Sequence, residues 1–303
     1  MPSGLFGDAG FTTVGVPETA GGGGATLADA LAVVTAAARR GALTPLIEHG
    51  ILAAWLAATA GHTLTSTTAS AAVGDPASSV RRRGDIVLFD GKVTDVPYAA
   101  DADTLVVLLP PEPGADGSTV AVVPMSAAGV TVSAGTDLTG VSIGDITFDD
   151  VPVVFHGSSP ATLDEFLDRG ALAYAAATAS AAAAVQDHSL RYVSERIQFG
   201  RPLAKFQAVQ QQLAQLAART TMMDIAVDAA VAAHEAPDDA RVATAAAKVV
   251  TAMSAHPVAA AGHQITVPSG PHPSIPSAAS PRRCGAGATA TVRSSSGQKT
   301  SPA

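Results

Sequence analysis

The sequence has few of the residues on which disulfide-bonded, metal-binding or nucleic-acid-binding proteins depend. Its single cysteine, Cys284, excludes an internal disulfide and a cysteine-based metal site, and it is typical of a reducing compartment. Lysine and arginine number 18 against 26 aspartates and glutamates, which gives a formal net charge of −8. That charge opposes contact with polyphosphate backbones and anionic membranes, so we expect no nucleic acid partner.

Long apolar runs and a secretory signal are also missing. The most apolar stretch, Leu46 to Ala60, contains Glu48 and His49 and is shorter than the roughly 20 residues that cross a bilayer. The first residues lack a basic region followed by an apolar core, which is the pattern of a signal peptide. We therefore expect a soluble, cytoplasmic protein without a membrane span.

Alanine dominates what is present. Hydrophobic residues make up 47% of the chain and aromatic residues only 4%, so helices packed at close range are expected. A length of 303 residues exceeds the usual size of one core. Together with the helical and β-branched patterns along the chain, the length predicts an α+β multidomain protein.

The pattern of apolar residues divides the chain into four parts. Residues 1–72 have helical spacing, residues 73–158 contain short β-branched runs, residues 159–265 are helical again, and residues 266–303 form an irregular tail rich in proline and serine. The β-branched runs at Ile86–Phe89, Leu105–Leu108 and Val120–Val123 predict a small antiparallel β-barrel or sandwich. Asp90-Gly91 is a hairpin signal within it.

The part from residue 159 to 265 predicts a bundle of long helices. Ser159-Pro160 resembles an N-cap followed by proline, and Thr162 to Glu165 has the spacing of a capping box. A first helix should run to about Glu195. A second should follow Pro202, and a third should follow Pro237 and pass through Val242, Ala245, Val249 and Met253.

The most informative stretch runs from Tyr192 to Gln210, YVSERIQFGRPLAKFQAVQ. It resembles the Y-x-x-x-R-x-Q-F-G-x-P-L-x-x-F-Q-x-x-Q signature of acyl-CoA dehydrogenases, at nearly every fixed position. The segment from Leu5 to Gly24 is similar to the family's opening "GL-x-x-x-x-VPE-x-x-GG-x-G", although the helices usually found upstream are missing. Ala99 to Asp103 resembles the "A-x-x-AD" pattern of the family's β domain.

The resemblance implies FAD-dependent oxidation of the Cα–Cβ bond of an acyl-CoA thioester. It assigns Arg196 and Gln207 to the flavin adenine dinucleotide, with Gln198 and Gln264 as further candidates. A planar guanidinium suits a pyrophosphate, and amide side chains pair with adenine, ribose or phosphate oxygens. Alternatively, Arg196 only caps a helix C-terminus and offsets its dipole. Phe199 and Phe206 are expected in the core.

The catalytic base is not identified by the sequence. The reaction needs a carboxylate against the α-proton. Counting back from Arg196, one position that family members use falls at about Gly170, which has no side chain. Asp168, Asp187 and His188 are expected to be surface or structural residues.

The tail carries a further hypothesis. Thr266-Val-Pro-Ser-Gly270 stands where the family has His-Gly-Ala-Ile-Gly. One lost nucleotide explains the change if this peptide is encoded ACG GTG CCA TCG GGG, because one added C in front gives CAC GGT GCC ATC GGG. The same frame converts residues 284–298 into a sequence that resembles the family's last helix. That helix would then be missing from this chain. The alternative is a natural disordered tail.

The resemblance also implies partners and two other functions. The partners are an acyl-CoA substrate, an acceptor like electron-transfer flavoprotein, and other subunits in a homo- or hetero-oligomer. The alternatives are a non-catalytic structural subunit of a heteromeric dehydrogenase and an inactive truncated relic.

Restoring one nucleotide directly after the codon for Ile265 should convert a flavin-poor protein into a yellow oligomer. The restored helix would bury apolar area at roughly 25 cal/mol per Å². Size-exclusion elution and bound flavin of the two versions measure the effect. A flavin-loaded tetramer formed by the original tail would contradict the frameshift hypothesis.

Overall fold

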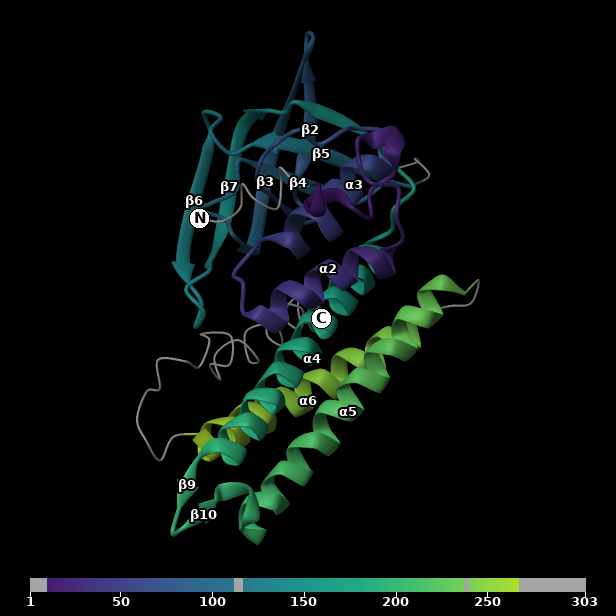
Figure 1. Ribbon diagram of the computed structural model, residues 1–303. Helices are drawn as coiled ribbons and strands as arrows, with labels where there is room; N and C mark the ends of the chain where they lie inside the picture. Colours follow the sequence, from purple (N-terminus) through teal and green to yellow (C-terminus); the bar gives the residue numbers. More distant parts are fainter. Residues whose placement is uncertain (1–9, 112–116, 237–239, 267–303) are drawn as a thin grey trace, which may run out of the picture. The chain divides into compact units, whose positions relative to one another are not determined.

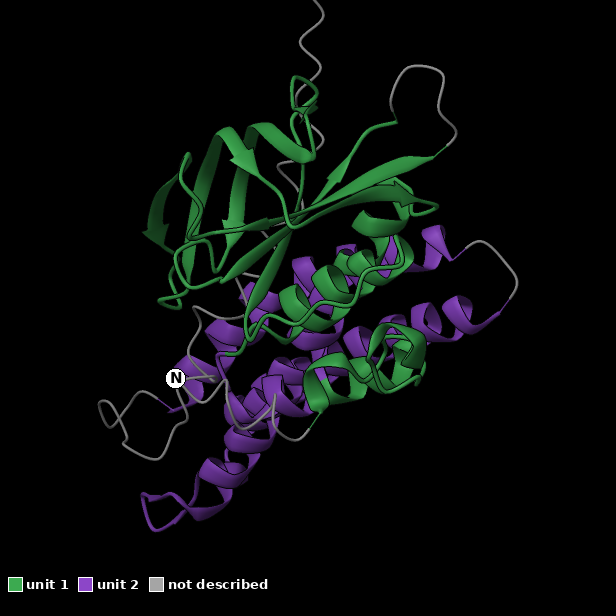
Figure 2. Cartoon of the chain, turned by 90° about the horizontal axis from the view of Figure 1, so that it is seen from above, with its two compact units in different colours: residues 1–33, 44–170 green, residues 34–43, 171–303 purple. Residues whose placement is uncertain are grey.

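The computed structural model describes residues 10–111, 117–236 and 240–266 (Figure 1). The described residues form two compact units, one made of those within 10–33 and 44–170 and the other of those within 34–43 and 171–266 (Figure 2). The first unit contains the short N-terminal helices and all long strands, and the second contains three long helical segments. The expected α+β architecture is confirmed.

The first unit begins with short helices around a glycine-rich loop. These are η1 (Phe11–Thr13), η2 (Glu18–Ala20), α2 (Leu27–Arg40, whose last turns belong to the second unit), the π-helix η3 (Ile47–Ala54) and α3 (Trp55–Thr59). A Cβ at Gly22 would lie 2.2 Å from the carbonyl oxygen of Val16. The glycine run therefore lets the backbone pack closely.

Two four-stranded sheets form the rest of the first unit. One has the order β1-β4-β5-β8 and the other β2-β3-β7-β6. All pairs are antiparallel except β1 and β4, which run parallel. The strands are β1 (Ala69–Val73), β2 (Ser79–Arg83), β3 (Ile86–Pro97), β4 (Thr104–Leu109), β5 (Ser118–Pro124), β6 (Val130–Thr136), β7 (Ser142–Pro152) and β8 (Phe155–Ser159).

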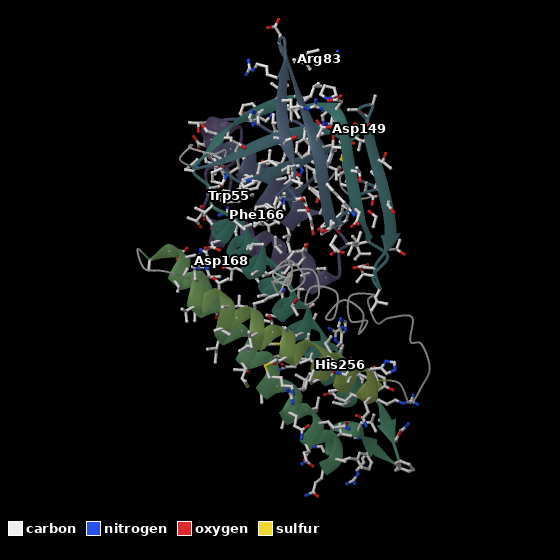
Figure 3. The ribbon with its side chains drawn as sticks, turned by 180° about the vertical axis from the view of Figure 1, so that it is seen from behind. Trp55, Arg83, Asp149, Phe166, Asp168 and His256 are labelled. Carbon is white, nitrogen blue, oxygen red and sulfur yellow. The ribbon has the colours of Figure 1, made fainter. Side chains whose placement is uncertain are left out.

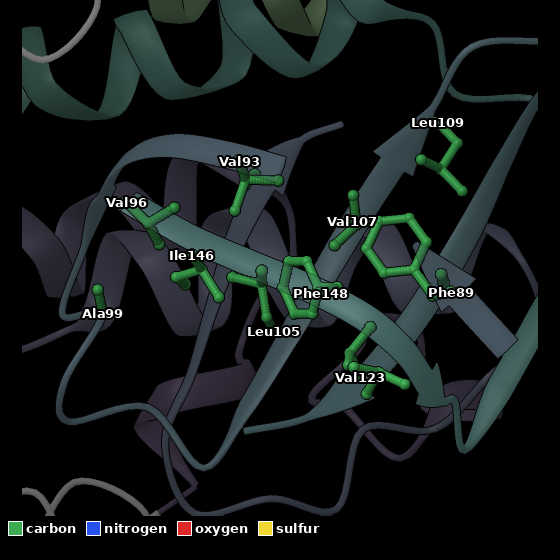
Figure 4. Close-up of a cluster of buried hydrophobic side chains, with 13 residues drawn as sticks. Phe89, Val93, Val96, Ala99, Leu105, Val107, Leu109, Val123, Ile146 and Phe148 are labelled. Carbon is green, nitrogen blue, oxygen red and sulfur yellow. The ribbon is translucent and has the colours of Figure 1, made fainter. Parts of the chain in front are cut away.

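An apolar cluster with residues from both sheets lies inside the sandwich (Figure 4). The ring centroids of Phe89 and Phe148 lie 4.9 Å apart, and both side chains are buried. Leu105 and Val107 of β4 belong to the same cluster. The predicted β-branched runs of β4 and β5 are buried almost throughout, so both faces of these strands are covered.

Two local expectations were wrong. Asp90-Gly91 lies inside β3, at an irregularity in its pairing with β7, and the turn between β2 and β3 is at Gly84-Asp85. Gly84 has the positive φ of 63° that such a tight turn requires. Ser159 closes β8 instead of capping a helix.

The second unit is built on α4 (Leu163–Glu195, from Ala171 onward), α5 (Gln207–Glu235) and α6 (Arg241–Thr266). Three short elements connect α4 to α5, namely β9 (Ile197–Gln198), β10 (Arg201–Pro202) and η4 (Leu203–Lys205). Thr162 caps α4, because its hydroxyl accepts a hydrogen bond from the Glu165 N–H at 3.1 Å. The predicted cap at the start of the helix and its end at Glu195 are thus confirmed, while only the Thr162 half of the capping box is present.

Small residues bring α4 and α6 together. Ala181, Ala255 and Ala259 form a buried cluster, and a Cβ at Gly262 would lie 2.3 Å from a methyl carbon of Val185. As predicted, the third helix passes through Val242, Val249 and Met253, and all three side chains are exposed. The family-like last helix falls on residues outside the described ranges.

Phe148→Ala should lower the free energy of unfolding of the first unit by about 3–5 kcal/mol, because it leaves a cavity beside Phe89. Urea unfolding followed by the fluorescence of Trp55, the single tryptophan of the chain, measures the loss. Ile86→Ala is the control, since Ile86 is 54% exposed. Equal unfolding midpoints for the two variants would contradict the sandwich core.

Candidate functional site

The predicted cofactor residues lie mostly at the corner between α4 and α5. Arg196 follows the last residue of α4, and its backbone N–H donates to the Tyr192 carbonyl at 2.8 Å. Its own carbonyl accepts from the Leu203 N–H at 2.9 Å. The backbone of Arg196 is thereby fixed from both sides, while the residue itself remains exposed.

A tight hairpin forms the tip of this corner. Gln198 pairs with Arg201, so only Phe199 and Gly200 make the turn, with φ values of 51° and 78°. Positive φ at both positions is the pattern of a type I′ turn, which favours Asn-Gly. A bulky residue in the left-handed region costs about 1–2 kcal/mol. The turn therefore carries strain at Phe199.

Phe199 is 91% exposed, so the expectation that it lies in the core was wrong. A strained backbone and an exposed large aromatic ring both oppose stability at this position. Residues with such backbone strain are frequent at functional sites, where contacts of the surrounding structure offset the cost of the strained conformation. The sequence signal was available, since an aromatic residue occupies the position that Asn normally takes in such a turn.

Phe206 anchors the hairpin to the start of α5. The Arg201 guanidinium lies 4.2 Å from the centroid of its ring, and Phe199 meets the same ring edge-on at 6.2 Å. The Gln210 amide nitrogen donates to the Ala204 carbonyl at 2.9 Å. These contacts fix the corner that presents Arg196 and Gln207.

Three of the four predicted cofactor residues share this corner. Arg196 and Gln207 are exposed, and Gln198 is partly buried. Gln264 is also exposed but lies apart, because its neighbour Gly262 packs on Val185. Val185 precedes Arg196 by 11 residues, which at the helical rise corresponds to about 15 Å along α4.

No carboxylate occupies the counted position of the catalytic base. Gly170 is buried, and a Cβ there would meet Leu52 at an ordinary 3.6 Å. Asp187 forms an ion pair with Arg39, a contact that fits the structural role expected for it. Among the described residues, no group of three His, Cys, Asp or Glu side chains could hold a metal ion.

Glu48 and His49 are buried within η3, in the apolar stretch where the sequence had placed them. The Ala69 N–H donates to His49 Nδ1 at 3.0 Å, which ties η3 to β1. Burial lowers the pKa of His49, while the charge of Asp103 raises it. A histidine that accepts this bond is neutral, so its role is structural.

Phe199→Asn should raise the free energy of unfolding of the helical unit by about 0.5–1 kcal/mol, because Asn tolerates the left-handed turn. Thermal or urea unfolding followed by circular dichroism measures the gain. Leu216→Ala, at a fully buried position of α5, should lose about 2–5 kcal/mol in the same assay. If Phe199→Asn lowers the free energy of unfolding as much as Leu216→Ala does, the Phe199 ring packs against the rest of the unit.

Known proteins are similar to this chain in sequence and in fold. The family model "Acyl-CoA dehydrogenase, C-terminal domain" matches residues 161–282. A probable acyl-CoA dehydrogenase of Bacillus subtilis, YngJ, is 30% identical over 166 residues, which are 51% of this chain and 44% of that protein. The chain thus aligns with less than half the length of this curated relative. No helix of the described residues is long and apolar enough to cross a membrane.

Solved structures extend the likeness of the fold to nearly the whole chain. An acyl-CoA dehydrogenase from Geobacillus kaustophilus matches with a TM-score of 0.76 at 21% identity, over 96% of this chain and 86% of that one. The ChsE4-ChsE5 complex from Mycobacterium tuberculosis matches with a TM-score of 0.76 at 22% identity, over 95% and 82% of the two chains. By sequence, residues 161–282 therefore belong to the acyl-CoA dehydrogenase family, and the fold of nearly the whole chain matches that of solved acyl-CoA dehydrogenases.

Proposed function

We propose that the chain takes part in FAD-dependent α,β-dehydrogenation of an acyl-CoA thioester, and that Arg196 and Gln207 bind the cofactor. FAD would supply the hydride acceptor for the substrate Cβ. An acceptor like electron-transfer flavoprotein would then receive the electrons. Family membership supports the reaction class.

The corner between α4 and α5 is the observation that carries this proposal. It combines an exposed guanidinium, an exposed amide and an exposed aromatic ring on a backbone that is fixed by Leu203 and Phe206. A guanidinium fork binds pyrophosphate oxygens, Gln207 can pair with ribose or adenine, and Phe199 offers a face for a flat ring. These groups suit a dinucleotide that approaches the corner from outside.

The strain at Phe199 distinguishes this reading from a plain helix cap. A capping role for Arg196 needs only its charge near the last carbonyls of α4. It does not require an exposed aromatic residue in a left-handed turn next to it. A cofactor that covers Phe199 would account for both features.

A second candidate is a non-catalytic subunit of a heteromeric dehydrogenase. Gly170 favours it, because a subunit that lacks a base at this position could still offer Arg196 to a cofactor held by its partner. The similar ChsE4-ChsE5 structure is a complex of two different chains. An inactive relic is the third candidate, in which neither activity nor cofactor binding remains.

Arg196→Ala should weaken FAD binding by about tenfold or more, because a charge-assisted fork contributes on the order of 1.5–3 kcal/mol. The visible spectrum after dialysis against graded FAD measures occupancy. A dye-linked assay with acyl-CoA thioesters of several lengths measures turnover.

Arg191→Ala provides the matched control, since Arg191 is also exposed and lies in the same helix. Its occupancy should equal that of the unchanged protein. If Arg196→Ala keeps the flavin occupancy of the unchanged protein, Arg196 serves only as a helix cap. If the chain binds flavin but shows no turnover, and a coexpressed partner chain restores the turnover, the chain is the non-catalytic subunit of a heteromeric dehydrogenase.

A further inference from the structure

A partly buried arginine in the first unit has donors that the fold leaves unused. Arg169 lies in the second turn of α4, and its Nε–H donates to the Ile51 carbonyl of η3 at 2.8 Å. Its guanidinium lies 4.6 Å from the ring centroid of Trp55, the single tryptophan. Trp55 and Phe166 lie near the start of α4 (Figure 3).

The contacts of Arg169 use one of its five N–H donors. Within the described residues, neither Nη atom forms a hydrogen bond and the guanidinium forms no ion pair. The four N–H groups of the Nη atoms therefore remain available. Arg81 differs, because its guanidinium binds both Asp90 and Asp150.

A charge in this position is poorly compensated. Burial lowers the pKa of Arg169 to about 10, and the charge of Glu165, one turn earlier, opposes this shift. Because Arg169 stays protonated at neutral pH, the unit holds a cation in surroundings that disfavour it. Such a group is stabilised when an anion pairs with it.

The surroundings select the kind of anion. Trp55 covers one face of the guanidinium, and the neighbouring Phe166 is 7% exposed. Leu52 packs towards the adjacent Gly170, which presents no side chain. A planar fork that lies over an aromatic ring suits a carboxylate on an apolar body better than a strongly hydrated inorganic ion. The contact with a π-helix is consistent with this, because π-helical turns are frequent at functional sites.

We propose that the Nη atoms of Arg169 bind the carboxylate of a small apolar ligand beside Trp55. The site lies wholly within the first unit and requires neither FAD nor turnover. It therefore extends beyond the proposed dehydrogenation and can be tested separately from it.

The position of Trp55 allows a direct titration. With excitation of tryptophan alone, butyrate added to the full chain should change the emission of Trp55 along a saturating curve. Chloride at equal ionic strength should not do so, because it lacks the paired oxygens of a carboxylate. An equal response to chloride, which would indicate screening of the charge, overturns the proposal. A response to inorganic phosphate with none to butyrate overturns the assignment of a carboxylate.

Variants test the role of the guanidinium. Arg169→Met keeps the aliphatic stem and should weaken butyrate binding by about tenfold or more, as expected for the loss of charge-assisted bonds. Arg169→Lys keeps the charge without the fork, so its affinity should be intermediate. Arg83→Met, at the far tip of the β2–β3 hairpin (Figure 3), should bind as the unchanged protein does.

Because these substitutions alter the surroundings of Trp55, saturation-transfer NMR of the butyrate methyl group gives a second readout that is independent of fluorescence. Circular dichroism and thermal unfolding establish that each variant is folded. If Arg169→Met fails to fold, Arg169→Lys carries the comparison. Undiminished butyrate binding in a folded Arg169 variant would overturn the proposal.

Discussion

The short distance between α4 and α6 is the constraint on which the helical unit depends. Alanine and glycine set it, because Gly262 leaves no room for a Cβ against Val185 and the neighbouring alanines add little volume. Close approach of this kind compensates for the shortage of large apolar side chains by increasing the number of van der Waals contacts. The same packing fixes α4 against α6, and Arg196 directly follows the last residue of α4.

The corner after α4 shows how such a scaffold supports a strained turn. The hydrogen bonds of Arg196 and the stacking on Phe206 come from residues on both sides of the hairpin. They hold Phe199 in a conformation that its side chain disfavours and leave its ring exposed. The free energy that holds the turn therefore comes from its neighbours, which is the usual arrangement at a site kept ready for a ligand.

α4 carries different chemistry at its two ends. Its N-terminal turns present Arg169 beside Trp55, with Gly170 as the next residue. Its C-terminal end presents Arg196. Arg169 belongs to the first unit, whereas Arg196 belongs to the second. They are independent features, and the observations that support one do not depend on the other.

The sequence by itself determined the elements and the family. Helical periodicity located the long helices, β-branched runs located several strands, and the run from Tyr192 to Gln210 located the corner, because these signals are local. Burial was decided by tertiary structure. Phe199 and Met253 are exposed although apolar, since a helix or turn with apolar residues on several faces does not reveal which face meets a neighbour. Asp90-Gly91 lies within β3 because pairing with β7 overrides its turn propensity. The contact of Arg169 with Trp55 likewise joins residues more than 100 positions apart, and only the folded chain brings them together.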